Sequence, residues 1–174
     1  LFAAHGHEVA ILSRKASASG PFPAYAWDPG RGEIDHDAVR RADVVINLSG
    51  AGIADARWTP SRKREIIDSR VKSARLLLNS FEQTGHRPQC YLSSGGIGYY
   101  GERGDALLDE KAAAGTGFLA ESCVEWEDAV REIAASGIRT VVFRIGIVLS
   151  MLGGALEKML LTARLGAGGY FGNG

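Results

Sequence analysis

The sequence predicts an α/β protein built on a doubly wound parallel sheet. Short apolar runs rich in β-branched residues alternate with helical patterns, at the spacing of strand–helix–strand units. Such runs are typical of parallel strands that are buried on both faces. Several of them end in glycine-rich or hydroxyl-rich segments, and ligands of open α/β sheets bind beyond the carboxyl ends of the strands.

Composition excludes several classes of protein. The chain has 174 residues, in which lysine plus arginine equals aspartate plus glutamate at 20 each, so its charge favours neither nucleic acid nor an anionic membrane. No apolar run is long enough to span a bilayer, and no signal peptide is visible. Cys90 and Cys123 lack the spacing of metal ligands, and a reducing cytoplasm is the expected compartment.

Both ends of the chain have the character of interrupted elements. The first residues indicate the last turn of a helix with its glycine stop at Gly6, and there is no initiator methionine. The last residues are rich in glycine and predict no further element. We therefore expect a fragment of a longer protein.

Residues 8–13 predict a buried strand that ends in Ser13 and Arg14. In dinucleotide-binding folds an acidic residue at this point binds the ribose hydroxyls of adenosine. A hydroxyl and a cation suit a 2′-phosphate instead, because a guanidinium binds phosphate through paired charge-assisted hydrogen bonds. A solvated basic loop is the alternative.

The stretch on which the rest of the chain is organised is residues 43–58. A short strand at residues 25–27 and a short helix at residues 34–41 come before it, and its own strand is expected at residues 44–48. That strand ends in Ser-Gly-Ala-Gly at residues 49–52, where small side chains allow a ligand to approach the backbone. An ordinary turn between strand and loop is the alternative.

The longest predicted helix begins with Thr59 as N-cap and Pro60 as first residue, and Gly85 ends it. Arg70 falls within its apolar stripe, so it requires an anionic partner or must extend to solvent. A ligand phosphate or ribose is one such partner, and a salt bridge within the protein is another. Glu65 lies beside the stripe, where it could accept from ribose hydroxyls or pair with neighbouring side chains.

A further strand at residues 89–94 ends in the candidate reaction site. Ser94 is followed by a glycine-rich loop that carries Tyr99 and Tyr100, and hydroxyls at a strand's carboxyl end suit a ligand site. A tight loop with two packing tyrosines is the alternative. Beyond it we expect a polar loop, a helix at residues 118–136, a buried strand at residues 139–149, and a last helix after Gly153 and Gly154.

Five motifs follow one another along the chain. They are Asn47-Leu48-Ser49-Gly50, the segment 58–70, Gly98-Tyr99-Tyr100-Gly101, Phe118-Leu119-Ala120 with Trp126-Glu127, and the segment 144–149. The ordered set resembles the extended short-chain dehydrogenase/reductase superfamily, in its branch of nucleoside-diphosphate-sugar epimerase-like proteins, and the resemblance covers nearly the whole chain.

The resemblance implies that residues 1–174 are part of a Rossmann NAD(P)-binding domain. Its first strand and glycine-rich phosphate loop would precede Leu1, and a smaller substrate domain would follow Gly174. The cofactor contacts carried over by position are Ser13 and Arg14 at the adenosine phosphate, Leu48 and Ser49 at adenine and ribose, Glu65 and Arg70 on the long helix, and Val148 near the nicotinamide. They favour NADP over NAD.

The sequence departs from the superfamily at its reaction chemistry. The superfamily uses a Ser or Thr and a Tyr-x-x-x-Lys pair, in which the lysine lowers the pKa of the tyrosine so that its phenol can act as an acid or a base. Here the equivalent helix begins with Phe118, which cannot transfer a proton, and Ser94 lies next to the serine position. Ser94, Tyr99 and Tyr100 are therefore the catalytic candidates.

Two functions follow from these expectations. The first is a cytoplasmic NADP-binding epimerase or oxidoreductase that acts on a small sugar-like carbonyl or carbinol. The second is a dinucleotide-binding protein without catalysis, such as an NADPH sensor or an interaction scaffold. For partners, we expect a small-molecule substrate, no nucleic acid and no membrane, and we consider a homodimer.

Overall fold

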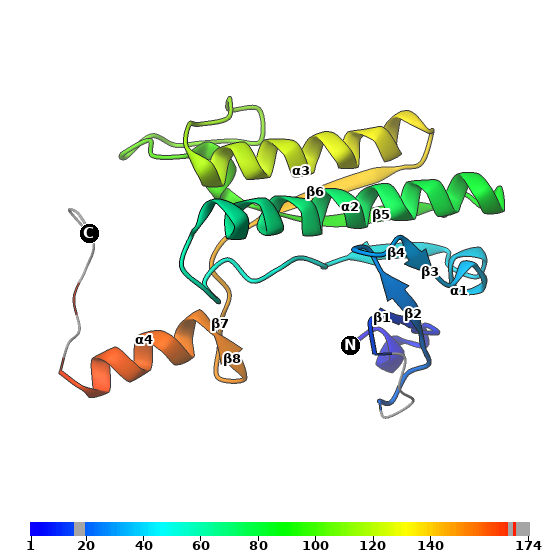
Figure 1. The fold of residues 1–174 in the computed structure, drawn as a ribbon, viewed down its shortest axis with the longest axis horizontal. Coiled ribbons are helices and arrows are strands. Elements are labelled where there is room, and N and C mark those ends of the chain that lie inside the picture. Colours follow the sequence, from blue (N-terminus) through cyan, green and yellow to red (C-terminus); the bar gives the residue numbers. More distant parts are fainter. Residues whose placement is uncertain (16–19, 167–168, 170–174) are drawn as a thin grey trace. The chain divides into compact units, whose positions relative to one another are not determined.

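The chain is described from a computed structural model that covers residues 1–15, 20–166 and 169 (Figure 1). These residues form two compact units, 1–144 and 145–174, and each is described by itself. The first unit carries two three-stranded sheets and the long helices.

The first sheet has the order β1-β2-β3. Strand β1 (Ile11–Ser13) pairs in parallel with β2 (Ala24–Asp28), and β2 pairs in antiparallel with β3 (Glu33–Ile34). Two expectations are wrong at their edges: the first strand begins at residue 11 rather than 8, and Ile34 belongs to a strand. Helix α1 (His36–Arg40) begins after Asp35, whose carboxylate accepts a hydrogen bond from the Asp37 backbone and so fixes the start.

The second sheet has the order β4-β5-β6, with β4 (Val44–Asn47), β5 (Cys90–Gly96) and β6 (Thr140–Ile145). Strands β4 and β5 are parallel, and Asn47 is the partner of Ser93. Since parallel strands end at the same edge, the segments that follow Asn47 and Gly96 leave the sheet on the same side. A short 3₁₀ turn, η2 (Ile97–Tyr100), follows β5 directly.

Two long helices pack on this sheet, and both were expected. Helix α2 (Pro60–Thr84) has Thr59 as its N-cap and ends at Gly85, which is left-handed with φ 67°. Helix α3 (Phe118–Ala135) lies beside α2 (Figure 1). The short turn η1 (Ala3–His5) also ends as predicted, at a left-handed Gly6.

The core lies between these two helices and the sheet. Its members are apolar side chains from β2, α1, α2, β5 and α3, together with Ile138 from the segment before β6, and they exclude water from the helix-covered face. They are Trp27, Val39, Ala74, Leu77, Phe81, Tyr91, Trp126, Ala129, Val130, Ile133 and Ile138.

The expectation that the strands are buried on both faces is wrong for β4. Side chains alternate along a strand, and Val45 and Asn47 point to the helix-covered face while Val44 and Ile46 point to the other. Val44 and Ile46 are 48% and 40% exposed. The physical reason is that α2 and α3 cover one face only, within the described residues of this unit.

The second unit corrects another expectation. The apolar run 139–149 is not one strand: β6 ends at Ile145, and β7 (Leu149–Ser150) pairs in antiparallel with β8 (Gly153–Gly154) to form a hairpin. Gly146 interrupts the run, as glycine within a strand pattern often does. Helix α4 (Ala155–Arg164) follows the hairpin as expected.

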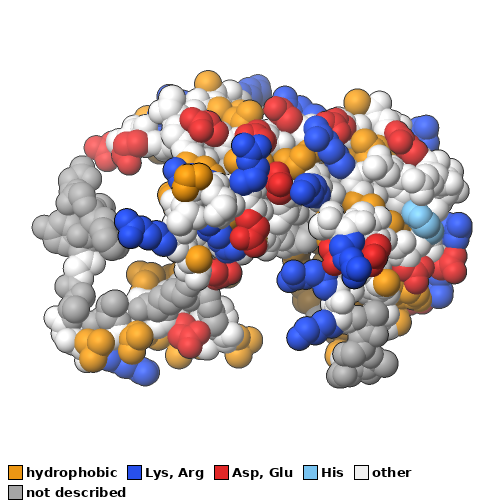
Figure 2. All heavy atoms as spheres, in the orientation of Figure 1, with side chains coloured by type: hydrophobic (Ala, Val, Ile, Leu, Met, Phe, Trp, Pro, Cys, Tyr) orange, Lys and Arg blue, Asp and Glu red, His pale blue; other side chains and the backbone are white. Residues whose placement is uncertain are grey.

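Charged side chains of both signs are interspersed over the visible surface of α2 and α3 (Figure 2). This mixture fits the equal numbers of basic and acidic residues in the chain. None of the helices that the structure describes is both long enough and apolar enough to cross a membrane.

Candidate functional site

The 49–52 loop follows the end of β4, and the side chain of Asn47 holds its first turn. The Asn47 side chain is buried, and its amide nitrogen donates to the phenol oxygen of Tyr91 at 2.8 Å and to the hydroxyl of Ser73 at 3.2 Å. Its amide oxygen accepts from both the backbone and the hydroxyl of Ser49. The amide nitrogen of Asn47 is thus anchored to β5 and α2, and its amide oxygen fixes the first turn of the loop.

The same loop presents Leu48 and Ser49 at its start, the residues expected at adenine and ribose. Leu48 is 72% exposed, and Ser49 is half-buried. The structure brings the two together with the bare backbone of Gly50. Their role toward a nucleotide stays a prediction.

Arg70 supports the loop from α2. Its guanidinium donates to the backbone carbonyls of Ala51 at 3.1 Å and Ile66 at 2.9 Å, and it stacks on the Trp126 ring at 5.0 Å. Burial lowers the pKa of the Arg70 guanidinium, with smaller influences from Cys123 and Arg62. In the described part of the chain its partners are carbonyls and a ring rather than a carboxylate, so its charge faces the loop without being neutralised.

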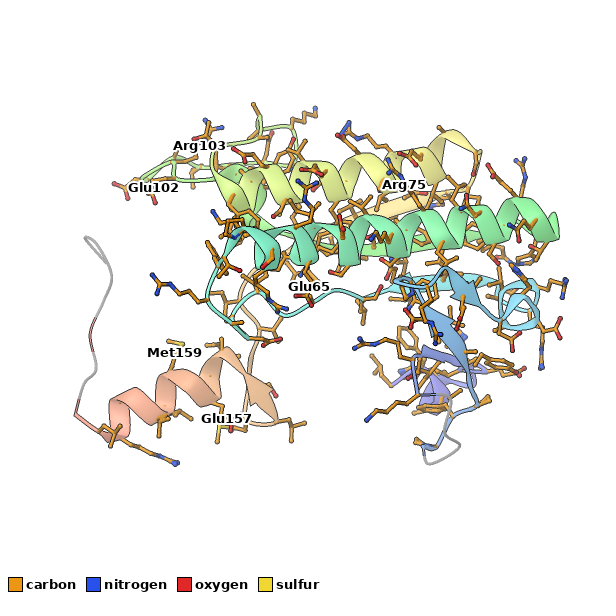
Figure 3. All side chains as sticks on the ribbon, in the orientation of Figure 1. Glu65, Arg75, Glu102, Arg103, Glu157 and Met159 are labelled. Carbon is orange, nitrogen blue, oxygen red and sulfur yellow. The ribbon has the colours of Figure 1, made fainter. Side chains whose placement is uncertain are left out.

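Glu65 is held by a neighbour on the same helix. Arg62 donates to Glu65 at 2.7 Å and to the carbonyl of Gly52 at 2.5 Å, and it lies 3.7 Å from Asp55. Glu65 projects from α2 in Figure 3, and its side chain is 59% exposed. Pairing with Arg62 was one of the two expectations for Glu65, and a ribose contact remains open to its second oxygen.

Ser13 and Arg14 lie at the carboxyl end of β1, as expected. Together with Lys15 they line an open hollow of about 530 Å³. The Ser13 hydroxyl accepts from the Lys15 backbone at 3.2 Å, while Arg14 is exposed and has no hydrogen bond or ion pair with any described residue. Its guanidinium is therefore available to an anion.

Ser94 connects the two neighbouring strand ends. Its hydroxyl donates to the backbone carbonyl of Asn47 at 3.3 Å, across from β5 to β4. The predicted strand end at residue 94 is wrong by two residues, because β5 continues to Gly96. Ser94 therefore lies within β5, and its bond reaches the last residue of β4, just before the 49–52 loop.

Sequence reasoning missed the strongest polar cluster of the site, which is centred on Arg144 at the end of β6. Two of its nitrogens bind the Glu127 carboxylate of α3 at 2.8 Å each, and a third donates to the phenol oxygen of Tyr100 at 3.0 Å. The guanidinium carbon also lies 3.5 Å from the centre of the Tyr99 ring. An arginine inside an apolar strand run was the available signal, since a charge there requires a partner.

Arg103 connects the loop after η2 to the segment that carries the two tyrosines, through hydrogen bonds to backbone carbonyls. This side chain donates to the carbonyl of Tyr100 at 2.9 Å and to the carbonyls of Ala113 and Ala114. The backbone of Gly115 closes the loop by donating to the Tyr99 carbonyl at 2.9 Å. Figure 3 shows Arg103 on this loop beside Glu102.

Phe118 stands at the start of α3, where the resembled superfamily has its tyrosine. Its ring meets Trp58 edge to face at 5.0 Å, and the Lys63 ammonium lies 4.9 Å from its centre. Four residues on, Ser122 is buried and donates to the Leu119 carbonyl. These side chains supply neither a phenol nor a cation from α3.

Val148 belongs to the second unit and is 68% exposed, just before β7. Its predicted place near a nicotinamide stays a prediction.

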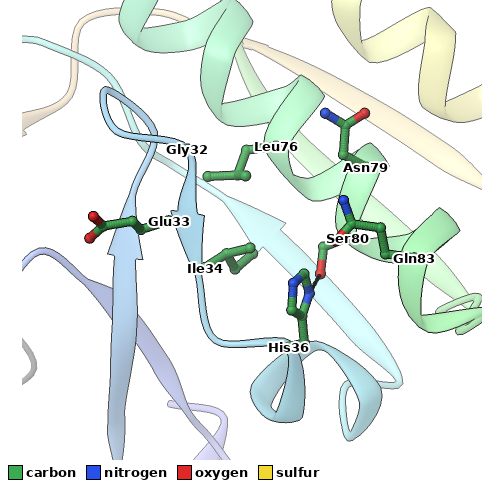
Figure 4. A pocket seen from close by; sticks show the side chains of 8 residues that line it. All are labelled: Gly32, Glu33, Ile34, His36, Leu76, Asn79, Ser80 and Gln83. Atoms are coloured by element: carbon green, nitrogen blue, oxygen red, sulfur yellow. Dashed lines mark hydrogen bonds between the residues drawn. The ribbon is translucent and has the colours of Figure 1, made fainter.

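A separate pocket of about 370 Å³ lies between β3, α1 and α2 in the first unit (Figure 4). There the His36 ring and the buried Ser80 hydroxyl are hydrogen-bonded at 2.8 Å, so the buried hydroxyl has a hydrogen-bond partner and its burial costs little free energy.

These features together define a class. Parallel strands carry helices on one face and end in a glycine-bearing loop, a free arginine and a cluster of hydroxyls, which is the arrangement of Rossmann-type dinucleotide-binding proteins. Among the described residues, no group of three or more His, Cys, Asp or Glu side chains is placed to hold a metal ion.

Comparison with known proteins identifies the family. No protein-family model matches the chain. The epimerase family protein Mb2239 of Mycobacterium bovis is 38% identical over 97% of the chain and 54% of its own length. The chain belongs to the epimerase family of extended short-chain dehydrogenases/reductases.

Solved structures agree with this assignment. The human epimerase family protein SDR39U1, crystallised with NADPH, superposes with a TM-score of 0.81 at 32% identity, over 99% of this chain and 57% of that one. A nucleoside-diphosphate sugar epimerase from Corynebacterium glutamicum gives a TM-score of 0.74 at 33% identity, over 97% and 34%. The chain thus spans about half the length of the curated relatives that it matches.

Proposed function

We propose that the protein binds NADP and acts as an epimerase- or oxidoreductase-like enzyme on a carbonyl or carbinol of a small, sugar-like molecule. One observation carries the proposal. The Ser94 hydroxyl of β5 bonds to the carbonyl of Asn47, the last residue of β4, so a candidate catalytic hydroxyl lies beside the start of the nucleotide-side loop. A reaction between a cofactor and a substrate needs both at one edge of the sheet.

The choice of NADP over NAD rests on Arg14. Its guanidinium has no partner among the described residues, and a 2′-phosphate is the group that distinguishes NADP from NAD. The human relative, which was crystallised with NADPH, supports this choice. We propose that Ser13 and Arg14 contact the phosphate, and that Leu48 and Ser49 contact adenine and ribose.

On the long helix, Arg70 and Glu65 complete the cofactor side of the proposed site. Arg70 holds the 49–52 loop in shape, and its unneutralised charge favours an anionic ligand beside that loop. We further propose that Val148 approaches the nicotinamide through its backbone.

The chemistry of a bound NADP is hydride transfer, so this chain must orient the substrate and move a proton. We propose that the hydroxyls which do so are Ser94 of β5 and Tyr99 and Tyr100 of η2. Both tyrosines are half-buried, which gives them fixed positions while keeping them accessible.

We also propose that residues 1–174 are part of a Rossmann domain in a longer protein, and that the protein works in the cytoplasm. Its cysteines, Cys90 and Cys123, are both free, in keeping with a reducing compartment. A homodimer is the assembly that we propose for it, and sedimentation of the full-length protein would test this.

The experiment that tests the function uses the full-length protein. NADPH and NADH binding would be measured by nicotinamide fluorescence, and oxidation of NADPH would then be followed with a panel of sugar nucleotides and simple carbonyls. Tight NADPH binding with turnover of at least one carbonyl supports the proposal. Absence of NADPH binding contradicts it.

A second candidate function is an NADPH sensor without catalysis. The observation in its favour is that Phe118 and Ser122 stand where a phenol and a cation are expected. A sensor would bind NADPH and change its conformation or partner affinity, while every carbonyl in the panel stays unreduced.

A further inference from the structure

The hydrogen bond between Arg144 and Tyr100 has a direction that the chemistry of the two groups fixes. A guanidinium has donors only, so the phenol oxygen of Tyr100 must be the acceptor at 3.0 Å. The phenol's own proton is therefore not used in this contact. No described residue accepts it, so it is free to be donated to a ligand.

The cation beside this phenol is fixed in place. Both oxygens of Glu127 bind the Arg144 guanidinium at 2.8 Å, and the Glu110 carbonyl accepts from it at 3.2 Å. The hydrogen bond to Glu127 is the main reason that the pKa of Arg144 is raised. Both partners of the ion pair are largely shielded, with side chains 17% and 12% exposed, so solvent screens the pair little.

The other two candidate hydroxyls differ from Tyr100. The proton of Ser94 already has an acceptor, the Asn47 carbonyl at 3.3 Å. Tyr99 presents its ring face to Arg144 at 3.5 Å, and no described cation contacts its oxygen. Of the three, Tyr100 alone combines an available proton with a cation on its oxygen.

We propose that Tyr100 is the proton donor of the reaction, and that Arg144, held by Glu127, is the positioning residue that stabilises the resulting phenolate. As a carbonyl carbon of the substrate accepts a hydride, the Tyr100 O–H bond breaks and a new O–H bond forms on the carbonyl oxygen. The negative charge left on the phenol oxygen lies beside the guanidinium. Water then returns a proton to Tyr100.

This inference rests on the proposed function, and it assigns separate tasks to the two tyrosines. Tyr99 contributes its ring, on which the Arg144 guanidinium stacks, while Tyr100 contributes its hydroxyl. The cation that accompanies the phenol comes from β6 rather than from α3. Arg144 thus supplies beside the Tyr100 phenol the positive charge that no lysine of α3 supplies.

The first test measures turnover in the full-length protein with NADPH and phenanthrenequinone, a reactive diketone. Tyr100→Phe should lower kcat by about a hundredfold or more, the usual contribution of a general acid, with little change in NADPH affinity. Tyr25→Phe is the control and should retain kcat within about threefold, because the Tyr25 phenol also accepts from an arginine, Arg41 at 3.5 Å, but lies on β2 outside the candidate reaction loop. A Tyr100→Phe variant with undiminished kcat overturns the inference.

The second test needs no turnover. N-acetylimidazole acylates accessible phenols, and mass spectrometry can follow the acylation of Tyr100 peptide by peptide. Because the guanidinium stabilises negative charge on the Tyr100 oxygen, Arg144→Lys should slow acylation at Tyr100 by about tenfold, since a lysine cannot bind the carboxylate and the phenol together. Arg75→Lys is the matched control, because Arg75 forms a comparable two-nitrogen contact with Glu132 far along α2 and should leave Tyr100 unaffected.

The two tests separate the possible failures. A protein that binds NADPH but reduces no carbonyl refutes the proposed enzyme, while acylation still reports on the Arg144–Tyr100 contact. Equal acylation of Tyr100 in wild type and in a folded Arg144→Lys variant overturns the inference alone. If Arg144→Lys fails to fold, Glu127→Gln keeps the side-chain shape and should slow acylation in the same direction by loosening Arg144.

Discussion

Gly50 and Arg70 fit against each other so closely that a side chain at position 50 has no room. A Cβ there would lie 2.9 Å from the central carbon of the Arg70 guanidinium. Arg70 cannot move aside freely, because its guanidinium donates to one carbonyl of the loop and one of the helix and also stacks on the Trp126 ring. The contact thus couples the shape of the 49–52 loop to helix α2.

The first prediction concerns Gly50→Ala. The added methyl should displace Arg70 and lower the free energy of unfolding by about 1–3 kcal/mol, the usual cost of overpacking. NADPH binding should weaken as well, because the loop that carries Ser49 shifts. Urea denaturation and NADPH titration would measure both effects. Gly20→Ala is the control, since a Cβ there meets nothing within 4 Å, and equal behaviour of the two variants would contradict the prediction.

The second prediction concerns pH and Tyr91. Burial is the main cause that raises the pKa of the Tyr91 phenol to about 12, from an ordinary value near 10. Between these values the unfolded chain has lost the proton and the folded one keeps it, so stability falls as pH rises from about 10 to about 12. Two pKa units correspond to about 2–3 kcal/mol.

Tyr91→Phe removes this ionisation. The variant should lose about 1 kcal/mol at neutral pH, because the Asn47 amide loses one partner, and it should lose less additional stability at alkaline pH than the wild type does. Urea denaturation of both proteins from pH 8 to pH 11 would show the two curves converging. Parallel curves would mean that Tyr91 does not control the alkaline transition.

The sequence predicted the helices better than it predicted the sheet. Thr59 and Gly85 bound α2 as expected, because capping depends on local chemistry. The interruption after Ile145 and the open face at Val44 were missed, because burial of a strand depends on what packs against it.

For the site, the positions of Ser49 and Ser94 near the ends of β4 and β5 could be predicted, because the ends of neighbouring parallel strands share an edge, and Arg14 was correctly expected at the end of β1. The Arg144–Glu127 pair could not be. Its members are 17 residues apart on different elements, and only the packing of α3 beside β6 brings them together.

The third prediction concerns Arg14→Ala. If Arg14 binds the 2′-phosphate, its removal should raise the Kd for NADPH by about tenfold or more, the value of one charge-assisted contact, and change the Kd for NADH by less than about twofold. Arg31→Ala is the control, since Arg31 is an exposed arginine of the same unit that pairs with Glu33. Titration by nicotinamide fluorescence decides the matter, and equal weakening for both cofactors would exclude the phosphate contact.

The fourth prediction concerns Gly115, whose backbone packs against the loop that carries the tyrosines. A Cβ at Gly115 would lie 2.3 Å from the Tyr100 carbonyl oxygen and 2.7 Å from the Cα of Gly101. Both atoms belong to the backbone, so Gly115→Ala must push η2 away rather than turn a side chain.

Displacement of η2 should separate the Tyr100 phenol from Arg144, and a shift of about 1 Å lowers turnover by about a hundredfold. NADPH affinity should stay near that of the wild type, because the atoms that the new methyl meets belong to Tyr100 and Gly101. Gly96→Ala provides the contrast within the same region: its Cβ would meet the Cys123 sulfur at 3.6 Å, an ordinary contact. Steady-state kinetics would test the pair, and a Gly115→Ala enzyme as active as Gly96→Ala would show that the position of η2 does not govern the reaction.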